Sequence, residues 1–205
     1  MKSSGRFTTA SLVSILALAV VALESIGASP WPSFGNGPLH THCSEYYGPQ
    51  GPAIAWRFSL GDTVYTSPAV AEDGTVYIGS SNSGLFAIDG STGAQLWAYD
   101  STTAVYQSPA IGASGTVYFS TASRLVALNP ANGESLGELA TTGVASAPTI
   151  ASDGTVYVGT SSGYLYAVDG TAGTVTWSVK IANESVHCPA VGSNGFVYAA
   201  SNDGN

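Results

Sequence analysis

Short apolar runs separated by turn residues recur along the chain from about residue 53 onward. Val76-Tyr77-Ile78 and Leu85-Phe86-Ala87-Ile88 are apolar at consecutive positions instead of alternating, which favours strands that are covered on both faces. Asp73-Gly74 and Asp153-Gly154 each lie between two such runs, and glycine accepts the positive φ that a tight hairpin requires. The pattern therefore predicts short antiparallel strands joined by tight turns.

The same arrangement repeats at a nearly constant spacing. Pro68, Pro109, Pro148 and Pro189 are 41, 39 and 41 residues apart, and the segments that follow them read DGTVYIGS, SGTVYFST, DGTVYVGT and NGFVYAAS. Each of the first three units continues with a third run, LFAIDGSTG, LVALNPANG or LYAVDGTAG, and closes with a fourth, AQLWAY, ESLGEL or TVTWSV. Four strands in about 40 residues is the pattern of a β-propeller blade.

We therefore expect an all-β fold, a β-propeller of four-stranded antiparallel blades spanning residues 53–205. Blades are expected at about residues 67–100, 108–140 and 147–180, with a partial blade at 188–205. Residues 53–58 fit the outer strand that completes the last blade of a closed ring. Since propellers close with about 4–8 blades, we interpret the chain as a fragment of a ring of seven or eight blades. The open blade edges of such a fragment could self-associate.

The first residues have the composition of an export signal. Lys2 and Arg6 precede an apolar core at 12–23 and the small-residue site Ile26-Gly27-Ala28, which predicts a signal peptide at 1–28, a leader at 29–52 and a secreted or periplasmic protein. An uncleaved anchor is the alternative, but the apolar run is short against the roughly 20 residues that span a bilayer. We expect no membrane span after cleavage.

Composition narrows the class of partner. The formal net charge is −8, and only Arg57, Arg124 and Lys180 are basic beyond the signal segment. Without a basic stripe to neutralise phosphates, nucleic acid is not expected as a partner.

The third and fourth runs of the first unit carry a recognisable motif. Residues 87–97 read Ala-x-Asp-x-x-Thr-Gly-x-x-x-Trp, the third unit has Ala172 in place of Thr, and the second unit has Asn129, Asn132 and Gly137 at the Asp, Thr and Trp positions. This motif resembles the tryptophan-docking repeat of the pyrroloquinoline-quinone (PQQ)-like propellers, a family that includes BamB-like proteins and quinoprotein alcohol dehydrogenases.

The resemblance implies that the motif is structural. Its tryptophan packs between neighbouring blades, and its Asp and Thr-Gly shape the turn. Gly137 lacks that ring, which predicts a weaker contact after the second unit. The docking residues so expected are Trp56, Trp97, Trp177, Asp89, Thr92, Gly93, Asp169 and Gly173.

The dehydrogenases of the family hold PQQ with Ca²⁺ on the propeller axis. In this chain Asp73, Asp89, Asp153 and Asp169 each precede a glycine, which marks them first as turn formers. We assign no catalytic, cofactor-binding or metal-ligating residue, and expect a non-enzymatic binding or protein-interaction scaffold for a protein or extracellular ligand. The alternative is a fragment of a PQQ- and Ca-dependent quinoprotein alcohol dehydrogenase; a third reading is a chain with no function of its own.

A few polar residues remain as candidates. Cys43 and Cys188 are the only cysteines, and an exported protein permits a disulfide between them, with unpaired thiols as the alternative. His40 and His42 beside Cys43 suggest a metal site but lack a fourth ligand. Asn183-Glu184-Ser185 is a glycosylation sequon, meaningful in a eukaryotic source.

Overall fold

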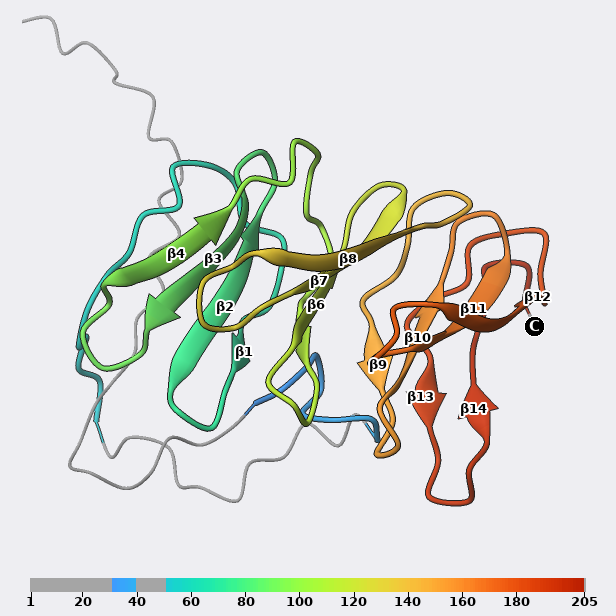
Figure 1. Ribbon diagram of the computed structural model, residues 1–205. Coiled ribbons are helices and arrows are strands. Elements are labelled where there is room, and N and C mark those ends of the chain that lie inside the picture. Colours follow the sequence, from blue (N-terminus) through green and yellow to red (C-terminus); the bar gives the residue numbers. More distant parts are fainter. Residues whose placement is uncertain (1–30, 40–50, 205) are drawn as a thin grey trace, which may run out of the picture.

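The computed structural model describes residues 31–39 and 51–204, which form an all-β fold. Three four-stranded antiparallel sheets follow one another along the chain, and a two-stranded sheet follows them (Figure 1). The predicted fold class is confirmed. No helix in the described part of the chain is long and apolar enough to cross a membrane.

Each four-stranded sheet is a meander in which sequential strands are neighbours. The strands of the first sheet are β1 (Ala69–Val70), β2 (Thr75–Ser80), β3 (Gly84–Asp89) and β4 (Gln95–Tyr99). Those of the second are β5 (Ala110–Ile111), β6 (Val117–Ser120), β7 (Arg124–Leu128) and β8 (Ser135–Ala140). Those of the third are β9 (Thr149–Ile150), β10 (Thr155–Gly159), β11 (Tyr164–Asp169) and β12 (Val175–Lys180), and the last pair is β13 (Ala190–Val191) with β14 (Val197–Tyr198).

The hairpin turns follow from their residues. In the turn between β1 and β2, Gly74 has φ +86°, and the Asp73 carboxylate accepts a hydrogen bond of 2.9 Å from the Thr75 amide. Gly154 and Asp153 repeat this geometry between β9 and β10, with φ +87° and a 2.9 Å bond to the Thr155 amide. An Asp-Gly pair thus specifies each turn, since Asp caps the turn locally and Gly tolerates the left-handed backbone.

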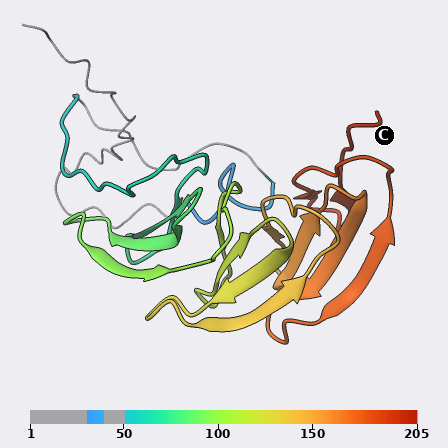
Figure 2. The same cartoon turned by 90° about the horizontal axis from the view of Figure 1, so that it is seen from above.

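The sheets stack side by side into an open arc, which Figure 2 shows from above. The outer strands β4, β8 and β12 follow the convex edge, and the leader residues 31–39, in blue, lie on the concave side. The innermost strands β1, β5, β9 and β13 have two residues each. This is the arrangement of consecutive propeller blades around an axis.

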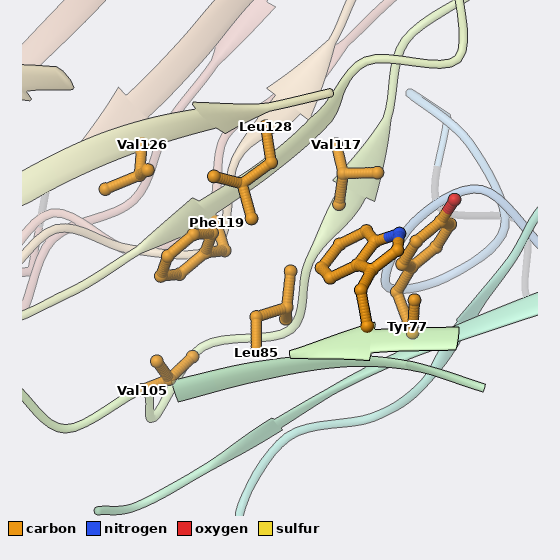
Figure 3. Packing of buried hydrophobic residues seen from close by; sticks show 9 residues of the cluster. Tyr77, Leu85, Val105, Val117, Phe119, Val126 and Leu128 are labelled. Atoms are coloured by element: carbon orange, nitrogen blue, oxygen red, sulfur yellow. The ribbon is translucent and has the colours of Figure 1, made fainter. Parts of the chain in front are cut away.

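The hydrophobic core lies between sheets, in separate layers. Leu85 and Tyr77 of the first sheet face Val117, Phe119 and Leu128 of the second (Figure 3). The second layer joins the second and third sheets and contains Tyr118, Leu125, Val156, Val158, Tyr166 and Val168. Because each inner sheet is covered on both faces, its strands are apolar at consecutive positions.

The segment before the first sheet differs from the expected outer strand. Residues 53–58 form no continuous strand, although Trp56 packs with Val76, Ile78 and Ile88 in a third apolar layer. In each four-stranded sheet the outer strand pairs with the third strand. None of the described sheets includes residues 53–58. Packing of Trp56 in this apolar layer holds the segment against the first sheet.

Candidate functional site

A tryptophan and a glycine turn join the first two blades. The Trp97 side chain on β4 is 8% exposed, and its indole Nε1 donates a 2.8 Å hydrogen bond to the Pro130 carbonyl in the next blade. Gly133 lies against the ring: a Cβ placed there would come within 2.6 Å of the indole. The turn after β7 thus accepts both the polar edge and the face of the indole.

Trp56 makes the same contact one blade earlier. Its Nε1 donates to the Gly90 carbonyl at 2.7 Å, and a Cβ on Gly93 would approach the ring within 2.7 Å. Gly93 and Gly133 have φ +74° and +73°. Two features therefore require glycine here, the left-handed backbone and the closeness of the ring.

The Asp of the motif holds the turn together. The Asp89 carboxylate accepts hydrogen bonds from the Ser91 hydroxyl at 2.6 Å, the Ser91 amide at 2.8 Å and the Thr92 amide at 3.0 Å. The Thr92 hydroxyl accepts a 3.2 Å bond from the Ala94 amide. These donors lower the pKa of Asp89, the Ser91 hydroxyl first.

Asp169 has the same place in the third blade. It accepts 2.8 and 2.9 Å bonds from the amides of Thr171 and Ala172, and these bonds lower its pKa, the Ala172 amide first. Both carboxylates thus accept hydrogen bonds from residues of their own turns.

Tyr118 takes part of the docking role where the tryptophan is missing. A Cβ on Gly137 in β8 would meet nothing within 4 Å, and the Tyr118 hydroxyl on β6 of the same sheet donates a 2.6 Å bond to the Gly170 carbonyl of the third blade. Gly170 is the counterpart of Gly90 and Pro130 in the repeat. Burial raises the pKa of Tyr118 above the ordinary value of a tyrosine, so the phenol stays a donor.

Sequence reasoning missed Tyr118, although a signal existed. Each unit has a tyrosine at this position, Tyr77, Tyr118, Tyr157 and Tyr198. In the second unit Ala127 of β7 pairs with Tyr118 on one side and with Gly137 on the other, whereas the first and third units have Trp97 and Trp177 at the position of Gly137. The contact after the second blade thus has a hydrogen bond that the prediction of a weaker contact did not include.

Trp177 differs from its two counterparts. Its side chain is 40% exposed, and its described ring contact is with Tyr157 of the same sheet, at a centroid distance of 5.9 Å. Every residue of β12 is exposed, among them Val179 beside Trp177. Gly173 has φ +68°, and a Cβ placed on it would meet nothing within 4 Å. The docking contact expected of Trp177 therefore has no counterpart among the described residues.

A second exposed feature is a pair of tyrosines before the innermost strands. Tyr65 and Tyr106 are 66% and 48% exposed, with ring centroids 5.6 Å apart. Each lies three residues before the proline that opens its unit, Pro68 or Pro109. This equal offset could have revealed the pair in the sequence.

The other candidates lie apart from these surfaces. Cys188 is half-buried, and burial raises the pKa of its thiol; Cys43, His40 and His42 lie outside the described residues, so the disulfide stays a prediction. Asn183 is exposed, and its amide donates to Asp203 at 3.0 Å. Within residues 31–39 and 51–204, no group of three or more His, Cys, Asp or Glu side chains could hold a metal ion.

Blades of this repeat length, with tryptophans docked on glycine turns, are similar to those of the PQQ-like β-propellers. The predicted resemblance to that family is confirmed. A family model described as outer membrane protein assembly factor BamB matches residues 139–205. A search of the curated proteins finds no match.

Solved structures match the fold of the described arc. The structure of BamB from Moraxella catarrhalis is 20% identical with a TM-score of 0.65, and the match covers 91% of this chain and 62% of BamB. The computationally designed protein Ika4 matches at 16% identity and a TM-score of 0.63, over 70% of this chain and 88% of Ika4. The designed protein Ika8 matches at 15% and 0.64, over 72% of this chain and 45% of Ika8. The chain thus spans less than two thirds of the length of BamB.

Proposed function

We propose that this chain is an exported, non-enzymatic PQQ-like propeller scaffold that binds another protein through the Tyr65–Tyr106 pair. The observation that carries the proposal is that two large aromatic rings stay exposed side by side on a rigid repeat. Tyrosine is enriched at protein interfaces because it buries a large area and keeps a polar edge. The net charge of −8 favours a partner with a basic contact surface.

The use of the acidic residues supports a scaffold over an enzyme. Asp89 and Asp169 accept hydrogen bonds from their own turns, so these carboxylates are structural parts of the blades. The family model that matches the last third of the chain describes an assembly factor, a role that consists of binding proteins. Export and a periplasmic or secreted location are part of the proposal, and rest on the signal-like residues 1–28.

Photo-crosslinking in the source cell tests the interaction. A benzophenone side chain placed at Tyr65 or Tyr106 should capture a protein that the same group at Leu136, 59% exposed on β8, does not capture. With the captured protein purified, Tyr65→Ala together with Tyr106→Ala should weaken its binding about tenfold or more, equivalent to about 1.4 kcal/mol. Leu136→Ala is the matched control. Equal capture at all positions, or unchanged affinity in the double variant, would refute this surface.

The enzymatic alternative makes a different prediction. A quinoprotein dehydrogenase fragment should bind PQQ in the presence of Ca²⁺ and oxidise alcohols with an artificial dye as acceptor. We expect neither quinone absorbance on the purified chain nor dye reduction. Dye-linked oxidation that depends on both PQQ and Ca²⁺ would overturn the scaffold proposal.

Self-association is a further part of the proposal. Trp177 and Val179, 40% and 44% exposed on β12, form an apolar face at the edge of the third blade. Exposed apolar faces of this kind mark contact sites in soluble proteins. We propose that this β12 face also joins two copies of the chain.

A further inference from the structure

The leader lies along the innermost strands of the arc. Trp31 pairs with Val70 of β1 in an antiparallel bridge, through a 2.7 Å bond from the Trp31 amide to the Val70 carbonyl and a 2.8 Å bond in return. The next residue, Pro32, accepts a 2.7 Å bond from the amide of Ile111 in β5. The leader thus passes directly from the first blade to the second.

A compact turn then carries the leader onward to the fourth unit. The Asn36 amide donates to the Ser33 carbonyl, and the Gly37 amide to the Ser33 hydroxyl, both at 3.0 Å. Gly35, Asn36 and Gly37 all have left-handed backbones, with φ of 76°, 62° and 94°, a conformation that Gly and Asn adopt most readily.

Beyond the turn, the leader reaches the last sheet. Pro38 accepts a 3.1 Å bond from the amide of Val191 in β13. Ser33, in the middle of the leader, is 7% exposed, so the segment is packed into the concave side instead of lying over it. Figure 2 shows the leader there, between the first sheets and the end of the chain.

The three contact points are equivalent in the repeat. Val70, Ile111 and Val191 each lie two residues after the proline that opens their unit. An innermost strand pairs with a neighbour on one side only, so these amides point from the free edge toward the axis, where each needs an acceptor. Two of the acceptors are proline carbonyls. Because proline has no backbone N–H, it adds no donor that would need a partner at this edge.

We propose that the inner edges of β1, β5 and β13 form a docking track for a peptide with a compact turn at its centre, and that leader residues 31–38 of the same chain are its resident ligand. As in strand addition, backbone hydrogen bonds hold the peptide against the sheet edges on both sides of this turn. Bound there, the leader ties the first, second and fourth units together across the axis. This site is separate from the Tyr65–Tyr106 pair and does not depend on the proposed function.

Hydrogen exchange on the full chain, followed residue by residue by NMR, tests the track. In the wild type, the amides of Val70, Ile111 and Val191 should be protected about a hundredfold or more relative to an unfolded chain. The buried amide of Gly159, which donates to the Ser146 hydroxyl at 3.0 Å, serves as the internal reference. Unprotected amides at these three positions would overturn the proposal.

A matched pair of glycine variants tests the role of the leader turn. A Cβ would meet nothing within 4 Å at either Gly37 or Gly51, but only Gly37 has a positive φ. We expect Gly37→Val to lower the protection of Val191 about tenfold or more and to leave Gly159 unchanged, because a β-branched residue resists the left-handed backbone. Gly51→Val should change neither amide. Unaltered protection of Val191 in Gly37→Val would refute the role of the leader.

A peptide added to the variant identifies the ligand. A synthetic peptide of residues 31–39, WPSFGNGPL, should restore the protection of Ile111 and Val191 in Gly37→Val, and a scrambled peptide should not. Failure of the peptide at millimolar concentration would overturn the docking track. Protection in the wild type that rises with protein concentration would assign the bound leader to a second copy, and so overturn the contact within one chain.

Discussion

At the scale of the residue, Trp97 and Trp177 show how one motif has two environments. Both occupy the same position of the repeat, yet Trp97 is 8% exposed and bonded to Pro130, while Trp177 is 40% exposed. The difference lies in what faces each ring. The turn of the second sheet lies against the Trp97 ring, whereas the described ring contact of Trp177 is with Tyr157 of its own sheet.

The two rings should therefore differ in their effect on stability. We expect Trp97→Ala to lower the free energy of unfolding by about 3–5 kcal/mol, because a buried ring and its hydrogen bond are lost. Trp177→Ala should cost about 1 kcal/mol or less, as exposed substitutions do. Chemical denaturation of the two variants measures both values. Equal losses would contradict the docking role of Trp97.

The Asp89 turn gives stability a dependence on pH. Hydrogen bonds hold the pKa of Asp89 below its ordinary value in the folded chain. A carboxyl with a depressed pKa contributes stability above its unfolded pKa, and that contribution is lost as the pH falls through the folded pKa. Asn129 shows that an amide can serve in this turn, since it accepts a 2.9 Å bond from the Ala131 amide.

We therefore expect Asp89→Asn to lose less stability than the wild type between neutral pH and about pH 3, below the ordinary pKa of Asp. Denaturation midpoints at the two pH values give the comparison. Glu72→Gln, which changes an exposed carboxylate outside this turn, is the control. If Asp89→Asn lost as much stability at low pH as the wild type does, the Asp89 carboxylate would not contribute to the pH dependence.

At the scale of the element, the glycine turns decide how blades meet. Gly133 and Gly173 have nearly the same backbone, with φ +73° and +68°. A Cβ on Gly133 would meet the Trp97 ring at 2.6 Å, whereas a Cβ on Gly173 would meet nothing within 4 Å. The two positions separate the cost of the backbone from the cost of the docked ring.

Gly173→Ala should therefore destabilise by about 1 kcal/mol, the cost of a left-handed alanine. Gly133→Ala should cost about 1–3 kcal/mol more, because the ring must also shift. Denaturation of both variants measures the difference. If the two costs were the same, the close contact between Gly133 and Trp97 would not exist in solution.

Tyr118 offers a test of the contact between the second and third blades. Tyr118→Phe removes the hydrogen bond to the Gly170 carbonyl and should cost about 1 kcal/mol. Tyr157→Phe is the matched control, because Tyr157 has the same place in the third unit and its ring packs on Trp177. If Tyr157→Phe lowered the free energy of unfolding as much as Tyr118→Phe or more, the hydrogen bond of Tyr118 would have no special role.

At the scale of the whole molecule, the outer strand β12 of the described arc exposes apolar side chains. Trp177 and Val179 form the β12 face, and their burial between two copies would stabilise a dimer. We expect the mass measured by sedimentation to rise with protein concentration. Trp177→Lys with Val179→Lys should abolish the rise, and Leu136→Lys on β8 should not. A constant monomer mass in the wild type would refute self-association through this face.

The sequence predicted the class of fold because the repeat is local information. Asp-Gly turns and consecutive apolar runs each act within a few residues, and the spacing of Pro68, Pro109 and Pro148 shows that the same four-stranded meander recurs. The turn role of Asp89 is just as local. The equal offset of Tyr65 and Tyr106 from their prolines marks them as equivalent in the repeat, but the contact and the exposure of the two rings come from loops that meet in space.

The sequence by itself therefore determined the repeat, the strands and their turns, since hydrogen bonds between neighbours along the chain specify them. Only the tertiary structure decided which rings are buried, because burial depends on the blade that lies opposite. It buried Trp56 and Trp97, exposed Trp177, and placed the Tyr118 hydroxyl within hydrogen-bond distance of the Gly170 carbonyl. It also laid the leader across three inner strands, a set of contacts between residues far apart in the sequence.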